Sequence, residues 1–183
     1  IEGGKTRAES VRNALSLSEV KKFDYVITHD AARPNIIEVD IINIYNEIIR
    51  SNSDCSIFYI PIVDSIKNIQ ENLTKNKADY YLVQTPQISK IDKLKSALHS
   101  LISIGTDIPD ESFAMESNDL MISRIQGRSS NIKITYKEDL ELLKKFITRT
   151  GTGFDLHTYK PGKGILIGGY LLSRPNNLLP WND

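Results

Sequence analysis

The sequence has a single cysteine and no excess of either charge. In a chain of 183 residues, the lone Cys55 excludes an internal disulfide. Lys and Arg together number 23, as do Asp and Glu, so no overall field would attract nucleic acid or an anionic membrane. No apolar run approaches the roughly 20 residues that span a bilayer, and the N-terminus has no signal-peptide pattern. We therefore expect no nucleic-acid or membrane partner, and a location in the bacterial cytoplasm or a plastid.

Cys55 itself lies in the apolar stretch DCSIFYIPIV, which is typical of a buried strand. A thiol in such a strand packs as a small hydrophobic group, and burial disfavours its reactive thiolate form. We expect no catalytic role for Cys55.

The apolar residues alternate between strand-like and helix-like spacing. FDYVITHDAARP predicts a short strand that leads into a polar loop, and CSIFYIPIV predicts a second, buried strand. EVDIINIYNEIIR, between them, and the later KIDKLKSALHSLI have helical spacing. Their apolar faces are Val39, Ile42, Tyr45, Ile48 and Ile49 in the first, and Leu94, Ala97, Leu98 and Leu101 in the second. The pattern predicts an α/β domain with a largely parallel sheet, covered by helices on both faces.

Residues 65–84, SIKNIQENLTKNKADYYLVQ, interrupt this alternation. They predict two strands joined by a polar turn, which would form an arm that leaves the sheet or contacts another subunit. Farther along, NIKIT predicts a strand that carries Lys133. TYKEDLELLKKFI predicts a helix that begins with a capping box of Thr135 and Glu138.

The N-terminal stretch GGKTRAES could bind a phosphate. Two glycines precede Thr6 and Glu9, which predict a capping box at the start of a helix. Free backbone N–H groups at such a start suit a phosphate, and Arg7 and Ser10 would lie beside it. An ordinary capped helix explains the same pattern.

Further candidate residues follow predicted strands, where α/β sheets bind their ligands. In HDAARP, Asp30 could hold a sugar hydroxyl or a metal and Arg33 a phosphate, although the two could also form a simple loop ion pair. The hydroxyl of Thr85 in QTPQ could donate to a phosphate oxygen. In IPDES, Asp110 and Glu111 fall at a predicted helix start, where helix capping explains them. Lys133 would either point to solvent from an edge strand or supply positive charge to a cleft.

Near the C-terminus, GTGFDLHTY places Asp155 and His157 two residues apart, both of them possible metal ligands. Without further context, such a pair also arises by chance at strand ends.

The motifs GG..R..S, HDAARP, TPQ, DE and G...NIKIT...DL, in this order, resemble the 2-C-methyl-D-erythritol 4-phosphate cytidylyltransferase family over about residues 1–148. The tail GTGFDLHTY..G..ILIGG resembles the beginning of the 2-C-methyl-D-erythritol 2,4-cyclodiphosphate synthase family, and fused proteins of the two families are known. The resemblance implies a Rossmann-like nucleotidyltransferase sheet with an extended β-arm in residues 1–148, truncated at its N-terminus. Residues 149–183 would be the first part of an α+β synthase domain.

For the first domain the resemblance implies transfer of CMP from CTP to methylerythritol phosphate with Mg²⁺, which yields CDP-methylerythritol and pyrophosphate. The implied catalytic residues are Lys133, which stabilises the transition state, and Lys77, which stands where the family has an arginine and acts from the arm of a partner subunit. The implied binding residues are Arg7 and Ser10 by the nucleotide, Asp30 and Arg33 by the methylerythritol or cytidine, and Ser65 and Thr85 at the substrate phosphate.

For the second domain the resemblance implies Asp155 and His157 as ligands of Zn²⁺, Mg²⁺ or Mn²⁺, in a reaction that releases CMP. It also implies a dimer through the arm and a trimer through the second domain. Because the family's N-terminal CTP-binding loop has no counterpart here, we expect this chain alone to be inactive. Two alternatives stay open: a non-catalytic dimerisation or nucleotide-binding module, and a pentitol-phosphate cytidylyltransferase.

Overall fold

The structure is a computed structural model that describes residues 1–146, Ile165–Ile167 and Tyr170–Leu172. The chain divides after Thr148 into two units. In the second unit, the described residues form an antiparallel pair of short strands, β7 (Ile165–Ile167) and β8 (Tyr170–Leu172). All other described elements belong to the first unit.

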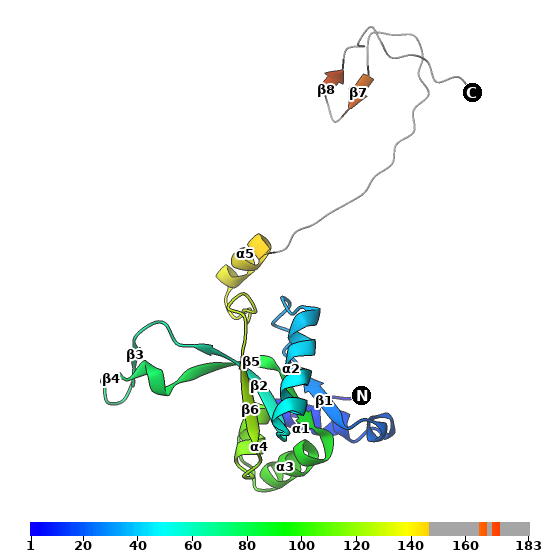
Figure 1. The fold of residues 1–183 in the computed structure, drawn as a ribbon, viewed down its shortest axis with the longest axis vertical. Helices are drawn as coiled ribbons and strands as arrows, with labels where there is room; N and C mark the ends of the chain where they lie inside the picture. The colour runs from blue at the N-terminus through cyan, green and yellow to red at the C-terminus, as the bar shows by residue number, and fades with distance from the viewer. Residues whose placement is uncertain (147–164, 168–169, 173–183) are drawn as a thin grey trace, which may run out of the picture. The chain divides into compact units, whose positions relative to one another are not determined.

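A four-stranded sheet forms the centre of the first unit, with the strand order β1-β5-β2-β6 (Figure 1). Its strands are β1 (Tyr25–Thr28), β5 (Tyr81–Lys90), β2 (Cys55–Pro61) and β6 (Ile122–Gln126). β2 and β6 are parallel, but β5 is antiparallel to both of its neighbours. The prediction of a largely parallel sheet is therefore wrong for β5, and the sheet is mixed. β2 and β5 are joined by an arm and not by a helical crossover, so the chain returns beside the strand that it left, in the opposite direction.

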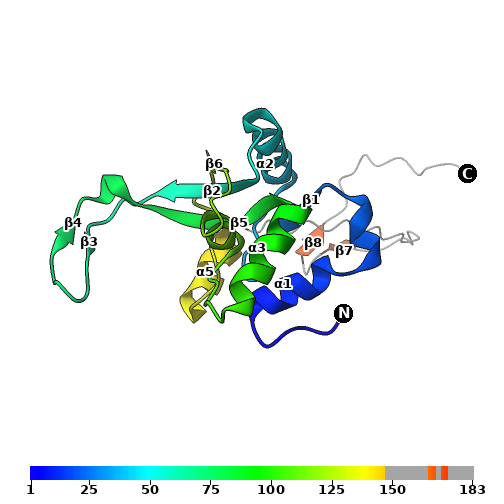
Figure 2. The ribbon, with the colours of Figure 1, turned by 90° about the horizontal axis from the view of Figure 1, so that it is seen from below.

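Helices cover both faces of this sheet, as predicted (Figure 2). The α-helices are α1 (Arg7–Leu15), α2 (Glu38–Ser51), α3 (Ile91–Ser103), α4 (Glu111–Glu116) and α5 (Lys137–Phe146), and the 3₁₀-helices are η1 (Ser18–Lys22) and η2 (Lys77–Asp79). α2 packs on one face through a small core, and α1, α3 and α4 pack on the other face through a larger one. None of the helices in the described part of the chain has the length and apolarity needed to cross a membrane.

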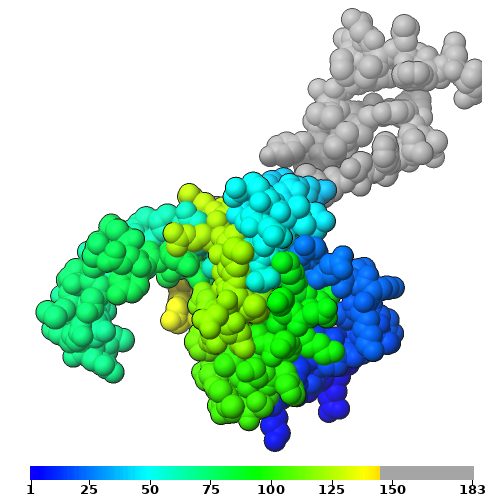
Figure 3. Space-filling model, turned by 60° about the horizontal axis from the view of Figure 1, so that its bottom comes forward, coloured from blue at the N-terminus to red at the C-terminus, as the bar shows by residue number. Residues whose placement is uncertain are grey.

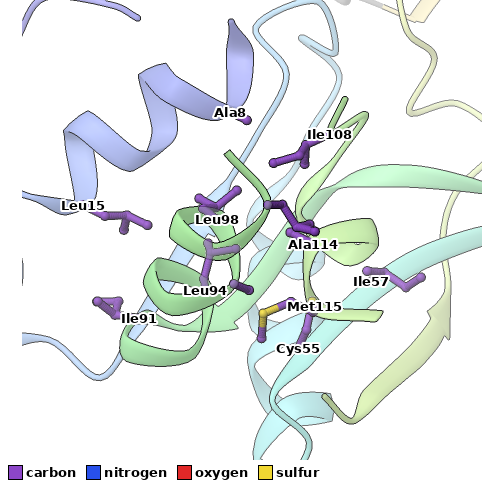
Figure 4. Packing of buried hydrophobic residues seen from close by; sticks show 12 residues of the cluster. Ala8, Leu15, Cys55, Ile57, Ile91, Leu94, Leu98, Ile108, Ala114 and Met115 are labelled. Carbon is purple, nitrogen blue, oxygen red and sulfur yellow. The ribbon is translucent and has the colours of Figure 1, made fainter. Parts of the chain in front are cut away.

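The larger core lies between α3 and the strands, with α1 and α4 at its sides (Figure 4). From α3 it takes Leu94, Ala97, Leu98 and Leu101, all of them buried. This confirms the predicted apolar face of that helix. The burial of each of the three leucines contributes about 1.5–3 kcal/mol, so α3 is a principal source of the stability of the sheet.

The apolar face predicted for α2 is wrong. The helix exists, but Val39, Ile42, Tyr45 and Ile49 are about half exposed, and of the predicted set only Ile48 is buried. The buried side of α2 consists of Asp40, Ile44, Glu47 and Ile48. Two of these four are acidic, and each has an arginine partner at 2.7 Å. A pattern built on apolar residues alone therefore selects the wrong side of this helix.

The arm predicted over residues 65–84 is present between β2 and β5, over residues 62–80, whereas residues 81–84 belong to β5. The arm contains β3 (Ile66–Lys67) and β4 (Thr74–Lys75), which pair antiparallel, and it stands away from the body of the first unit (Figure 3). Several of its apolar side chains are exposed, Ile69 almost fully at 97%. Exposed apolar side chains on such a projection favour contact with another protein surface, and the dimer stays a prediction.

Cys55 should be chemically inert in the native protein. It is fully buried in the larger core, and burial raises the pKa of its thiol to about 12. At pH 8 its thiolate fraction is then about 10³-fold lower than that of an exposed cysteine of pKa about 8.5. We expect labelling of Cys55 by a thiol reagent to slow by a similar factor relative to the protein in urea, as read by peptide mass spectrometry. Equal labelling rates in the two conditions would contradict this burial.

Candidate functional site

The candidate site lies where the carboxyl end of β1 meets the middle of β5 and the start of α4. The loop after β1 carries Asp30 and Arg33. A segment between β6 and α5 lies beside this loop, because the Ile134 amide donates to the Ala32 carbonyl at 2.8 Å. Arg7 reaches the same place from the first turn of α1. Three distant parts of the chain thus bring polar groups to one end of the strands.

Asp30 is the centre of a group of three cations, which we call the Asp30 cluster: Asp30, Arg7, Arg33 and Lys133. Its Oδ2 lies 3.0 Å from Nζ of Lys133 and 3.7 Å from Nε of Arg33, and its Oδ1 lies 3.8 Å from Nε of Arg7. The ion pair between Asp30 and Arg33 that the sequence allowed is therefore present. The structure also brings together four of the residues predicted for the site.

The electrostatics of this cluster keep Asp30 ionised. Burial alone would raise its pKa, but the hydrogen bond and charge of Lys133 outweigh burial, together with the charges of Arg7 and Arg33, and hold the pKa below its ordinary value. Burial lowers the pKa of Arg33, and Asp30 opposes this effect. The cations around Asp30 offset its charge, and the half-exposed ammonium of Lys133 can still bind an anionic ligand.

Glu111 belongs to this site, although its position in the sequence suggested only helix capping. Its carboxylate is 1% exposed and accepts two hydrogen bonds from the Arg7 guanidinium, both at 2.7 Å, and one from the Thr28 hydroxyl at 2.9 Å. Asp110 alone caps α4, by accepting from the Phe113 amide. The second acid of the DE pair is thus free for another role, and that redundancy is the signal that could have revealed it.

Thr85 lies at the site, but its hydroxyl is engaged by the loop after β1. It accepts a hydrogen bond from the Asp30 amide at 3.0 Å and lies 3.2 Å from Nδ1 of His29. Nε2 of His29 in turn lies 2.9 Å from the Arg33 carbonyl. Thr85 and His29 therefore fix the conformation of the loop that presents Asp30 and Arg33.

Ser10 lies at the start of α1, where protein groups cap the helix. Its hydroxyl donates to the Thr6 carbonyl and accepts from the Gly4 amide, both at 2.9 Å. The predicted capping box of Thr6 and Glu9 is confirmed. A side chain at Gly4 would collide with Glu9, so this close turn requires glycine. The geometry agrees with an ordinary capped helix, and contact of Ser10 with a nucleotide stays a prediction.

The segment that carries Lys133 is not a strand. Residues 131–134 have no strand assignment, so the predicted strand at NIKIT is wrong. The following helix, α5, is confirmed, but its first turn is capped differently, because Asp139 accepts from the Thr135 and Tyr136 amides at 2.8 Å each. Lys133 is about half exposed at 52%, which leaves its ammonium accessible to a ligand.

Ser65 and Lys77 lie on the arm, apart from the Asp30 cluster in the chain's own fold. Ser65 is exposed just before β3. Lys77 is exposed at the start of η2, and its Nζ donates to the Val63 carbonyl at 2.6 Å, which joins the two sides of the arm. Their roles in a site formed with a second subunit stay predictions.

The described residues contain no group of three or more His, Cys, Asp or Glu side chains placed to hold a metal ion. Asp155 and His157 lie outside the described residues. Their role as metal ligands therefore stays a prediction.

The mixed sheet with helices on both faces makes the first unit an α/β domain with cations at its strand ends. Its fold is similar to the crystal structure of 2-C-methyl-D-erythritol 4-phosphate cytidylyltransferase from Francisella tularensis, with a TM-score of 0.73 and 33% identity over 80% of this chain and 70% of that chain. The model of the 2-C-methyl-D-erythritol 4-phosphate cytidylyltransferase family matches residues 1–149. The chain belongs to this family.

The match covers only part of the length of two bacterial relatives. The 2-C-methyl-D-erythritol 4-phosphate cytidylyltransferase of Pseudoalteromonas translucida (strain TAC 125) is 40% identical over 142 residues, which cover 76% of this chain and 58% of the relative. The "bifunctional enzyme IspD/IspF" of Pelagibacter ubique (strain HTCC1062) is 34% identical over 185 residues, which cover 100% of this chain and 48% of the relative. The chain thus spans about half the length of these relatives.

Proposed function

We propose that the chain forms the larger part of an enzyme domain that transfers CMP from CTP to 2-C-methyl-D-erythritol 4-phosphate. The products would be CDP-methylerythritol and pyrophosphate, in the non-mevalonate route to isoprenoids. The observation that carries this proposal is the Asp30 cluster, which gathers Arg7, Arg33 and Lys133 at the strand ends in a member of this family.

The proposed reaction needs charge neutralisation and positioning more than proton transfer. The phosphate of methylerythritol phosphate is ionised near neutral pH, so it can attack the α-phosphorus of CTP without a general base. The bond to pyrophosphate breaks as the new P–O bond forms, and negative charge on the oxygens is stabilised by nearby cations. Lys133 is the cation best suited to this task, because its ammonium is accessible and its stem is flexible. Arg7 and Arg33 would hold the substrates in place.

Mg²⁺ would enter this site with the phosphates of the nucleotide. The described residues do not fit a metal site made by protein ligands alone, because Asp30 is paired with cations and Glu111 with Arg7 and Thr28. Mg²⁺ commonly binds through substrate phosphates and water with few carboxylates. The chain's own contribution would be the cations that hold the phosphates.

The remaining residues of the site are proposed to act as the family resemblance implies. Ser65 would hold the substrate phosphate together with Thr85, whose hydroxyl would exchange its contact with His29 for a phosphate oxygen. Ser10 would lie near the nucleotide. Lys77, on the arm, would reach the site of a partner subunit in a homodimer. The exposed apolar side chains of the arm support such a contact.

We also propose that residues 149–183 begin a cyclodiphosphate synthase domain that releases CMP, with Asp155 and His157 as ligands of Zn²⁺, Mg²⁺ or Mn²⁺. The match of the bifunctional Pelagibacter relative along the whole chain supports this. The complete protein would then combine arm-mediated dimers with trimers of the second domain.

The substrate is tested with the complete gene product, CTP and Mg²⁺. We expect pyrophosphate release with methylerythritol phosphate and at least about 10²-fold lower kcat/KM with ribitol 5-phosphate, because buried groups that lose their substrate partners discriminate strongly. A coupled pyrophosphate assay measures both rates. Turnover of ribitol phosphate alone would instead support a pentitol-phosphate cytidylyltransferase, and no turnover of either would support a non-catalytic module.

A further inference from the structure

We propose that Arg128 is a positioning residue that holds Lys133 in place for catalysis. Arg128 lies five residues before Lys133, directly after Gly127 at the end of β6, and does not belong to the Asp30 cluster. Its side chain ties the segment that carries Lys133 to the start of α2. This inference rests on the proposed function, because it assigns Arg128 a role in that same reaction.

The guanidinium of Arg128 bonds three different groups at once. Its Nε donates to Asp40 Oδ1 at 2.9 Å, and its NH2 donates to Asp40 Oδ2 at 2.7 Å and to the Asn35 carbonyl at 2.6 Å. Its NH1 donates to the Ser130 hydroxyl at 2.8 Å. A planar guanidinium can satisfy all these acceptors together, whereas the ammonium of a lysine cannot. Arg128 thus joins α2, the loop before it and the segment after β6.

Asp40 is a fixed anchor for this contact. Its side chain is 8% exposed, and it also accepts the Ile37 amide at 3.1 Å, at the start of α2. Burial alone would raise the pKa of Asp40, but the bond with Arg128 and the Ile37 amide outweigh burial and keep the pKa below its ordinary value. The anchor is therefore charged at neutral pH.

The buried side-chain amides of Gln84 and Asn131 also hold the segment between Arg128 and Lys133 in place. Nε2 of Gln84 donates to the carbonyls of Arg128 and Asn131, at 3.1 and 3.2 Å. The Asn131 side chain donates to the Thr85 carbonyl at 2.9 Å, and the Asn131 carbonyl accepts from Arg33 at 2.8 Å. A side chain at Gly127 would collide with Gln84, so glycine permits this close approach.

These contacts matter because no sheet ladder fixes residues 131–134. Two backbone bonds hold this segment: the Ile134 amide donates to the Ala32 carbonyl, and the Asn131 amide donates to the nearby Arg128 carbonyl at 3.0 Å. Otherwise the backbone position of the segment depends on side chains of other elements. A catalytic group displaced by about 1 Å can lose roughly 10²-fold in rate. Loosening the contact at Arg128 should therefore affect the step that uses Lys133.

The test compares Arg128→Lys with Arg50→Lys in the complete gene product. Arg50 is the control, since it also bonds an acid of α2, Glu47, at 2.7 Å, but it does so from the last turn of that helix with a side chain that is 77% exposed. We expect Arg128→Lys to lower kcat by about tenfold or more, with a change in KM for CTP below about twofold. Arg50→Lys should leave both unchanged. In a Lys133→Ala background, Arg128→Lys should have no further effect on kcat, because the group that it positions is gone.

A second measurement does not depend on activity. Hydrogen exchange of the Ile134 amide should become at least about tenfold faster in Arg128→Lys than in Arg50→Lys, because the segment opens more often. An unchanged exchange rate overturns the positioning role, whatever the activity. An equal loss of kcat with and without Lys133 overturns it as well. If the complete protein transfers no CMP at all, the proposed function fails, and the exchange result still decides whether Arg128 holds this segment.

Discussion

Replacing Lys133 with alanine in the complete gene product should lower kcat for pyrophosphate release by about 10²–10³-fold, with little change in KM for CTP. This is the range expected when one group that stabilises transition-state charge is removed. In the structure, the Lys133 ammonium faces Asp30 at 3.0 Å while remaining half exposed, so it can exchange this partner for a phosphate oxygen. A group that acts only in the transition state affects kcat and not ground-state binding.

Two control variants distinguish a specific role of Lys133 in the transition state from a general effect of losing a positive charge. Lys137→Ala removes an exposed lysine four residues away, at the start of α5, and should leave both constants unchanged. Lys133→Arg keeps the charge and should retain more activity than Lys133→Ala. If KM rose by the same factor as kcat fell, Lys133 would bind substrate without a particular role in the transition state. Steady-state kinetics at saturating methylerythritol phosphate decide between these outcomes.

The sequence was most informative where local pattern and tertiary contact agree. The apolar residues of α3 repeat at helical spacing and are buried together, so both the helix and its face were predictable. The residues of HDAARP follow a short strand, and β1 does deliver Asp30 and Arg33 to the strand ends. In both cases, residues close together in the sequence were enough to predict the structure.

The failures share a physical cause, which is that partners distant in sequence change the meaning of a local pattern. The buried side of α2 was missed because it includes Asp40, whose ion-pair partner Arg128 is 88 residues away. The antiparallel direction of β5 follows from the arm, whose length gives no direction by itself. For the same reason Glu111 was interpreted as a cap, since its partner Arg7 is 104 residues away.

Glu111→Gln should lower the free energy of unfolding by about 2–3 kcal/mol. The carboxylate is buried and receives three hydrogen bonds, two of them from the Arg7 guanidinium. Glutamine keeps the size but loses the charge, and its NH₂ group would face the donors of Arg7. Removing one partner of a buried ion pair costs about 3–5 kcal/mol. The loss should be smaller here because Arg7 keeps 37% of its side chain exposed and can regain water.

The matched control is Glu141→Gln, because Glu141 also forms an ion pair, with Lys144 at 2.6 Å, but is 70% exposed. An exposed pair contributes less than about 1 kcal/mol, so this variant should unfold almost like the wild type. Urea unfolding followed by circular dichroism compares the two.

The double variant Arg7→Met/Glu111→Gln should lose less free energy of unfolding than the sum of its single variants, because no unpaired charge is left behind. If Glu111→Gln and Glu141→Gln were equally stable, the Arg7 pair would be only a surface contact, and KM for CTP should then be unaffected by Glu111→Gln. A stability loss together with a raised KM for CTP would instead show that Glu111 both supports the fold and orients Arg7 toward the nucleotide.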